Sequence, residues 1–140
     1  MPQPPRTTAA DRAACGQVNL PEVRAELLDL ADRYERALTG NQIQVLDELF
    51  WDSPEAVRIG ATEELFGTDE IAAFRRARPT AGLARTRTRT EVTVFGADYA
   101  VTTTLFTREG VPGTGRQQQT WVRFPDCGWR IVAAHVSQRP

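Results

Sequence analysis

The sequence has 140 residues, of which 41% are hydrophobic and 25% are charged, a composition typical of one globular domain with a substantial core. Its 17 basic and 18 acidic residues nearly cancel, which leaves a formal net charge of -1 at pH 7. This balance argues against nucleic acid or an anionic membrane as the main partner, because both are bound through a basic footprint. A small-molecule ligand remains open.

Signals for targeting and for metal binding are weak. No apolar run approaches the roughly 18 residues of a membrane span, and residues 1–14 lack the apolar core of a secretory signal, so we expect a cytoplasmic protein. Cys15 falls in a predicted tail and Cys127 in a predicted turn. With a single histidine they form neither a disulfide framework nor a metal-ligand set, so we expect no metal and no cofactor.

The first folded element is predicted to be a helix that follows a disordered tail at residues 1–18, so that the domain covers residues 19–140. Asn19 and Glu22 fit an N-cap with an acid at the third helical position. Apolar residues then recur at helical spacing: Val23, Leu27, Leu30, Tyr34 and Leu38. Tyr34 is therefore expected on the buried stripe, either as a plain core aromatic or as a functional group.

Two arginines follow in short elements. A second helix is predicted from Asn41 to about Phe50, and a short strand at residues 56–59 points Arg58 opposite to its neighbours. A third helix begins at Thr68 and stops before Pro79, because the residue before proline resists helical geometry. Arg58 faces either solvent or the interior. Arg78, at the end of the third apolar stripe, serves either the helix dipole or the sheet.

The remainder of the chain predicts a meander of four strands. In the run Arg85-Thr-Arg-Thr-Arg-Thr90, alternation places the three arginines on one face, which is typical of a solvated strand face that discourages edge pairing. This strand continues to Phe95 and a second one covers residues 99–107. A hairpin follows, with strands at residues 115–124 and 129–137.

Polar residues gather on one predicted face of that hairpin. Strict alternation gives one strand a face with Gln117, Gln119 and Trp121. It gives the other strand a face made of Trp129, Ile131, Ala133, His135 and Ser137. We therefore predict that this side of the sheet is the wall of a pocket. His135 is expected there either as a functional group or as a buried neutral histidine with a hydrogen-bond partner.

Three helices and a long meander predict an α+β domain in which a curved, mainly antiparallel sheet wraps around the helices. Segments throughout this domain carry a family resemblance: residues 19–23, 34–35, 45–51, 57–58, 65–67, 74–75, 77–79, 115–117, 119–123 and 128–137. The last of these reads Gly128-Trp-Arg-Ile-Val-Ala-Ala-His-Val-Ser137. The set resembles the AtzH-like proteins, with the oxalurate-catabolism HpxZ-like group, in the SnoaL-like and nuclear transport factor 2-like superfamily.

The resemblance implies a conical α+β barrel with an enclosed pocket, a homodimer formed through the outer sheet face, and possible association with an amidase-type enzyme. It also implies metal-free decarboxylation and hydrolysis of an N-carboxylated urea or a similar small carboxylate in ureide or s-triazine breakdown. The catalytic tyrosine and arginine of such proteins match Tyr34 and Arg58.

These residues support a mechanism. Arg58, with Arg78, would grip a carboxylate through paired hydrogen bonds, and Tyr34 would protonate the nitrogen left by departing carbon dioxide. His135 would hold a carboxylate or a water. The substrate-binding set completes the predicted pocket: Trp51, Phe66, Arg78, Gln117, Gln119, Trp121 and Ser137.

Two other readings stay open. The first is a non-catalytic module that binds a small ligand or stabilises an amidase, since one scaffold hosts enzymes and binding proteins alike. The other, which we place after the binding module, is a cyclase-like or isomerase-like enzyme. That chemistry would want an inward carboxylate, and the pattern places none clearly in the pocket.

Overall fold

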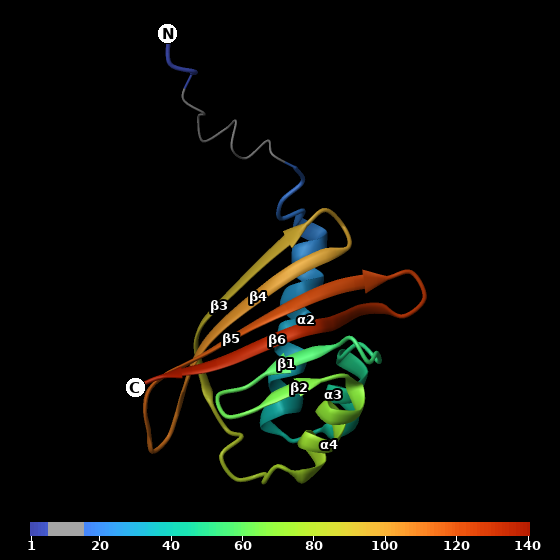
Figure 1. Cartoon of the computed structure of the whole chain (residues 1–140), viewed down its shortest axis with the longest axis vertical. Helices are drawn as coiled ribbons and strands as arrows, with labels where there is room; N and C mark the ends of the chain where they lie inside the picture. The colour runs from blue at the N-terminus through green and yellow to red at the C-terminus, as the bar shows by residue number, and fades with distance from the viewer. Residues whose placement is uncertain (6–15) are drawn as a thin grey trace.

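The computed structural model describes residues 1–5 and 16–140 (Figure 1). Cys15 and most of the predicted tail lie outside the described residues, and Cys127 is an exposed free thiol. The elements occur in the order α2 (Pro21–Thr39), α3 (Ile43–Leu49), β1 (Val57–Ile59), β2 (Glu64–Phe66), α4 (Thr68–Ala77), β3 (Thr86–Phe95), β4 (Tyr99–Arg108), β5 (Val111–Phe124) and β6 (Gly128–Arg139). In the described part of the chain, no helix is long and apolar enough to cross a membrane.

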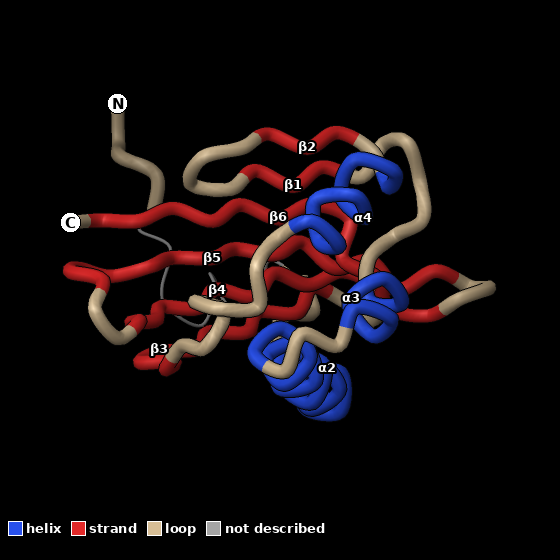
Figure 2. The backbone as a smooth tube through the Cα atoms, turned by 90° about the horizontal axis from the view of Figure 1, so that it is seen from below, coloured by secondary structure: helices blue, strands red, loops and turns tan. Residues whose placement is uncertain are grey.

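The six strands form one mixed sheet in the order β2-β1-β6-β5-β4-β3. β1 pairs with β6 in parallel, and every other neighbouring pair is antiparallel. Because β2 and β3 are edges that do not pair with each other, the sheet is open and does not close into the conical barrel that the family resemblance implied. The α+β class and the curved, cone-like arrangement are confirmed (Figure 2).

The three helices cover one face of this sheet, which we call the inner face; the opposite side is the outer face (Figures 1 and 2). α2 packs against β3, while α3 reaches β6 and α4 reaches β2. The buried core between helices and sheet is built from residues such as Leu27, Leu46, Ile71, Val94, Trp121 and Ile131. The apolar stripe predicted for α2 is buried, including Tyr34, except that Leu30 is only partly buried.

The start of α2 differs from the prediction. Asn19 has a positive φ of 59°, so it cannot adopt the extended backbone of an N-cap, and Leu20 takes that position without a side-chain cap. The Asn19 carboxamide oxygen instead accepts a hydrogen bond from the Val94 backbone N–H at 3.0 Å. Val18 also bridges to Phe95. The segment before α2 is therefore fastened to the end of β3.

A one-residue bulge changes the predicted faces of β6. Thr120 on β5 pairs with Ala133, but its neighbour Trp121 pairs with Ile131, so Val132 is an extra residue without a partner. Such a bulge interrupts the alternation of side chains. Trp129 and Ile131 lie on the inner face, but beyond the bulge it is Ala134 that is buried there. The prediction that Ala133, His135 and Ser137 share the face of Ile131 is therefore wrong.

A second bulge, at Thr88 on β3, reorients the arginine run. Arg87 pairs with buried Phe106 and Arg89 with Leu105, which leaves Thr88 unpaired. Arg87 accordingly turns toward α2, where it contacts Asp32 at 2.8 Å, while Arg89 stays exposed. Arg85, just before β3, is also directed inward. The predicted solvated face therefore holds for Arg89 but is wrong for Arg85.

Candidate functional site

Tyr34 lies on the inner side of α2 and is held by a chain of hydrogen bonds. Its hydroxyl oxygen accepts from the Gln117 amide nitrogen at 3.2 Å. The Gln117 carboxamide oxygen in turn accepts from Arg85 at 2.8 Å. Gln117 is buried on β5, and its side chain links Tyr34 on α2 to Arg85. The phenol is therefore oriented by its neighbours while its own proton stays available.

Arg85 is the most deeply buried cation beside Tyr34, with a side chain only 2% exposed. Its guanidinium donates two parallel hydrogen bonds to the Glu35 carboxylate, at 2.9 and 2.7 Å. The Phe106 ring lies 4.2 Å from the same guanidinium. That ring rests on Gly115, where any Cβ would collide with it. Gly115 on β5, which has no side chain, thus leaves room for the Phe106 ring and for Arg85 above it.

Arg58 is buried on β1 and points inward, so of the two orientations that the sequence left open the interior one is found. It donates to the Glu63 carboxylate at 2.9 Å and lies 5.1 Å from the centre of the Phe74 ring. Partial burial would raise the pKa of Glu63, but hydrogen bonds from Thr62 and Arg58 lower it below its usual value. The ion pair is therefore formed at neutral pH.

The end of α4 brings two more arginines to the same place. Arg75 contacts Asp47 at 2.9 Å and the Phe50 ring at 4.3 Å, yet its second terminal nitrogen is buried without a hydrogen-bond partner. Arg78 follows the last helical residue in extended geometry, as the proline after it requires. Its Nε is likewise buried and without a partner, and Phe74 lies 6.0 Å away.

Arg108, at the end of β4, completes what we call the arginine cluster: Arg58, Arg75, Arg78, Arg85 and Arg108. Its guanidinium lies 4.7 Å from the Phe106 ring, and its Nε is buried without a partner. In the described part of the chain, three of the five arginines pair with carboxylates, namely those of Glu63, Asp47 and Glu35. Two positive charges of the cluster are left without one.

The cluster changes the acidity of the tyrosine at its centre. Burial alone would raise the pKa of Tyr34. The positive charges of Arg58 and Arg85, the hydrogen bond donated by Gln117 and the charge of Arg75 together outweigh that effect and lower the pKa below its usual value of 10.0. The phenol is thus a better proton donor than an ordinary tyrosine, and the surroundings favour its anion.

The two arginines without carboxylates carry an electrostatic cost. Burial lowers the pKa of Arg78 and of Arg108, and the like charges of Arg58 near the first and Arg85 near the second lower it further. Both groups nevertheless stay charged, because a guanidinium in a protein does not lose its proton. An anion placed among them would relieve this repulsion and use the unpaired donors.

Part of the predicted set is brought together at this cluster: Tyr34, Arg58, Arg78 and Gln117. Gln119 and Trp121 share the inner face of β5 with Gln117, as predicted. Both contact the Thr102 hydroxyl, which receives a hydrogen bond from the Trp121 indole at 3.1 Å and lies 3.2 Å from the Gln119 amide oxygen. The Gln119 amide nitrogen is buried without a partner.

The other predicted residues lie elsewhere. Phe66 is 59% exposed and pairs with Val57, so it lies on the side of the sheet opposite to Arg58. Trp51 stacks on Phe124, with ring centres 5.5 Å apart, and lines the cleft between α3 and α4 that also contains Arg75. His135 and Ser137 line a shallow groove on the outer face with Thr103, Leu105, Arg116 and Gln118. Because of the bulge at Val132, this pair lies on the face of the sheet opposite to Tyr34.

Sequence reasoning did not assign Arg75, Arg85 and Arg108 to the site. A signal for Arg85 was present, since Asp32 and Glu35 lie three residues apart on α2 and present two carboxylates on one side of the helix. Those acids now hold Arg87 and Arg85. Arg108 gave no comparable signal, because it follows the strand in a stretch that reads as a loop.

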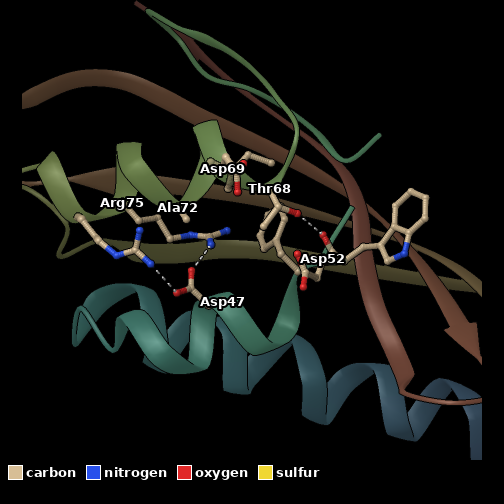
Figure 3. Close-up of a pocket in the computed structure, with 10 residues that line it drawn as sticks. Asp47, Asp52, Thr68, Asp69, Ala72 and Arg75 are labelled. Carbon is tan, nitrogen blue, oxygen red and sulfur yellow. Dashed lines mark hydrogen bonds and ion pairs between the residues drawn. The ribbon is translucent and has the colours of Figure 1, made fainter. Parts of the chain in front are cut away.

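A cleft of about 430 Å³ opens between α3 and α4, next to the cluster (Figure 3). Asp47 on α3 faces Arg75 on α4 across it, and Asp52 and Asp69 lie toward its other end. The Thr68 hydroxyl donates to the backbone oxygens of the segment before β1, at 3.1 and 3.0 Å, which fixes the start of α4. Arg75 therefore belongs both to this cleft and to the surroundings of Tyr34.

The fold and the placement of polar groups between helices and sheet define an α+β protein of the nuclear transport factor 2-like class. Solved structures of that class share the fold, including a nuclear transport factor 2-like superfamily protein from Salmonella enterica with 26% identity and a TM-score of 0.68, covering 85% of this chain and 92% of that one. The AtzH-like family model matches residues 16–140. The chain belongs to the AtzH-like family.

Two solved structures are more similar in sequence. A protein of unknown function from Pectobacterium atrosepticum shares 54% identity, with a TM-score of 0.85 over 88% of this chain and 95% of that one. A cystatin-like fold protein from Burkholderia xenovorans shares 43% identity, with a TM-score of 0.84 over 89% and 98%. Comparison with curated proteins gave no match. Family and fold together support a domain that binds or converts a small molecule.

Proposed function

We propose that this protein is an enzyme that removes the carboxyl group from an N-carboxylated urea, or from a similar small carboxylate. The observation that carries the proposal is a buried tyrosine of lowered pKa, Tyr34, surrounded by cations that exceed the carboxylates of the cluster. Membership of the AtzH-like family supports the same reading. A site with surplus guanidinium donors suits a carboxylate ligand, because the planar fork of arginine matches two carboxylate oxygens.

In the proposed reaction the bond between the carboxylate carbon and the urea nitrogen breaks, and its electron pair stays on nitrogen. Carbon dioxide leaves and the nitrogen takes the proton of the Tyr34 hydroxyl. The resulting tyrosinate is stabilised by Arg58 and Arg85, and water returns the proton afterwards. General acid catalysis of this kind contributes about 10²- to 10⁴-fold to a rate.

The surroundings of Tyr34 would help this step in a second way. Phe74 and Phe106 cover the arginines with apolar surface, and α2 closes the site from the side of the helices. A carboxylate that enters such a place loses part of its hydration, and its charge is then stabilised by fixed donors in place of mobile water. Departure of neutral carbon dioxide relieves that desolvation.

The test is carbon dioxide release from freshly prepared 1,3-dicarboxyurea, measured against the spontaneous background, with wild type and Tyr34→Phe side by side. We expect release well above background in the wild type and a loss of about 10²-fold or more in the variant. Arg58→Lys keeps a charge but not the planar fork, and we expect it to lose most of the activity as well.

Tyr99→Phe is the matched control, because Tyr99 is an exposed tyrosine at the start of β4. It should retain the wild-type rate. Equal rates in wild type and Tyr34→Phe would contradict the proposed role of the phenol. Absence of any enhancement, together with a thermal shift on adding carboxylated ureas, would favour the alternative of a binding or amidase-accessory module.

An isomerase-like activity would require a free carboxylate as a base. In the described part of the cluster, Glu35, Glu63 and Asp47 each pair with an arginine, which favours decarboxylation over that alternative. The expected homodimer through the outer face and the association with an amidase-type enzyme stay predictions. Sedimentation of the purified chain, alone and with the amidase, tests both.

A further inference from the structure

Two phenylalanine rings near Tyr34 are each contacted by two arginines. Phe74 lies 5.1 Å from the Arg58 guanidinium carbon and 6.0 Å from that of Arg78. Phe106, some thirty residues later on β4, has the same arrangement. Its ring lies 4.2 Å from Arg85 and 4.7 Å from Arg108. The site therefore contains two separate pairs of cations, each gathered on one aromatic ring.

Within each pair the two arginines differ in the same way. One is occupied by a carboxylate: Arg58 by Glu63 at 2.9 Å, and Arg85 by Glu35 at 2.7 Å. The other arginine, Arg78 or Arg108, has no carboxylate partner among the described residues, and its Nε is buried without a hydrogen-bond acceptor. A buried charged donor left unpaired is costly, so each ring holds one cation that is ready for an external acceptor.

The two unoccupied arginines are close enough to influence each other and Tyr34. The charge of Arg108 is felt at Arg78, and both guanidiniums interact electrostatically with the Tyr34 hydroxyl. They come from different elements, since Arg78 ends α4 and Arg108 ends β4. Two unpaired cations from different elements thus act on one phenol.

We propose that Arg78 and Arg108 form a two-point clamp that binds the two anionic ends of a short dicarboxylate, with Tyr34 between them. The location of this clamp rests on the proposed function, which places the ligand at Tyr34. One guanidinium would hold each carboxylate through its fork of N–H donors. The two surplus positive charges of the cluster match the two negative charges of such a ligand.

This arrangement divides the work among the arginines. Arg58 and Arg85 are engaged by carboxylates and lower the pKa of the phenol, whereas Arg78 and Arg108 select the ligand. A monocarboxylate can satisfy only one of the two free cations and leaves the other buried and unpaired. The clamp therefore discriminates by charge number, since a site built for a charged group rejects an analogue that lacks it.

The experiment measures binding without turnover. Isothermal titration calorimetry on the full chain compares malonate and succinate with their monoamides, malonamate and succinamate, which have nearly the same shape but one negative charge. We expect at least one dicarboxylate to bind the wild type about tenfold or more tightly than its monoamide. Arg78→Gln and Arg108→Gln should each reduce that preference severalfold, and the double variant should abolish it.

Arg89→Gln is the matched control, because it removes the same charge from an exposed residue on β3. It should keep the wild-type preference. Arg78→Lys is a second variant that retains the charge without the fork, and we expect an intermediate preference. Thermal unfolding of each variant checks that the fold is kept.

Several results would overturn the clamp: no dicarboxylate preference in the wild type, an undiminished preference in both single variants, or an equal loss in Arg89→Gln. These outcomes are separate from the fate of the proposed reaction. If 1,3-dicarboxyurea is not turned over but the preference follows Arg78 and Arg108, the reaction fails and the clamp stands. If turnover depends on Tyr34 but the variants discriminate normally, the clamp alone is wrong.

Discussion

The two faces of the β5–β6 hairpin carry similar kinds of side chain and have very different environments. On the inner face, Gln117, Gln119 and Trp121 are buried and join hydrogen bonds that reach Tyr34 or Thr102. On the outer face, His135 and Ser137 line an open, shallow groove. The difference shows that residue type alone does not identify a site. Amides with few catalytic associations lie at the inner cluster, while the single histidine lies on the other side of the sheet.

The position of each residue is decided by backbone geometry as much as by sequence. One extra residue at Val132 moves His135 from the predicted inner face to the outer one, and it brings Ala134 beside Arg58 in the neighbouring strand. The bulge at Thr88 has a comparable effect on the arginine run. Bulges near functional sites commonly redirect side chains in this way.

The largest contrast between the faces should appear in stability. Trp121 is fully buried on the inner face, and its indole donates to Thr102. We expect Trp121→Ala to lower the free energy of unfolding by about 3–5 kcal/mol, because removal of a buried aromatic leaves a cavity as well as lost contacts. Urea denaturation followed by circular dichroism measures this change.

The outer face supplies the control for that substitution. Gln118 is exposed on the same strand, β5, and its amide nitrogen donates a hydrogen bond to the Thr103 hydroxyl at 3.1 Å. Gln118→Ala should change the free energy of unfolding by less than about 0.5 kcal/mol, as is usual for surface positions. A loss of unfolding free energy in Gln118→Ala comparable to that in Trp121→Ala would mean that the outer face is covered in solution. The difference between the two faces would then exist only in the single chain.

Much of this fold was predictable because the relevant signals are local. The apolar stripe of α2, the stop at Pro79 and the alternation of Gln117, Gln119 and Trp121 depend on neighbours a few residues apart, and the structure confirms all three. The bulges were not predictable in the same way. They arise from pairing between strands, and nothing in the composition of β6 marks Val132 as an extra residue.

The site was predictable to a similar extent. Tyr34 and Arg58 were found from their own helix and strand, together with a family resemblance. Arg85 was missed because its alternation with threonine resembles a solvated strand, and its burial depends on Glu35, fifty residues earlier. Arg108 was missed because its environment is created by Arg85 and by Glu35 and Tyr34 on α2, which are distant in the sequence.

The second prediction concerns the acidity of the inner cluster. The difference in tyrosinate absorbance between wild type and Tyr34→Phe isolates one phenol, and its titration should have a midpoint below 10. The same titration can be measured as the absorbance difference between Arg58→Gln and the double variant Arg58→Gln, Tyr34→Phe. Its midpoint should lie at higher pH than in the wild type, because Arg58 is the first of the charges that lower this pKa.

The sign of the linked effect on stability follows from that shift. A phenol whose pKa is lower in the folded protein than in the unfolded chain stabilises the fold increasingly as pH rises through the folded value toward the unfolded value near 10. This contribution is lost as pH falls through the folded pKa. The stability difference between wild type and Tyr34→Phe should therefore grow in favour of the wild type as pH rises from the folded pKa toward 10. A constant difference across that range would contradict the lowered pKa.

The smallest effect is expected at the residue that looked most functional in the sequence. His135 is exposed on the outer face, beyond the bulge at Val132, and no contact connects it to Tyr34 within the described residues. We expect His135→Ala to keep the rate of carbon dioxide release within about twofold and the free energy of unfolding within about 0.5 kcal/mol. Both are measured beside Tyr34→Phe under the same conditions.

This substitution also tests the assignment of the two faces. If the outer face took part in the chemistry, loss of the imidazole would remove a group that can transfer a proton near neutral pH, and the rate would fall by roughly 10²-fold or more. A fall of that size in a folded variant would move the reaction away from the arginine cluster. An unchanged rate, beside an inactive Tyr34→Phe, would place the chemistry on the inner face, because the two substitutions lie on opposite sides of the same sheet.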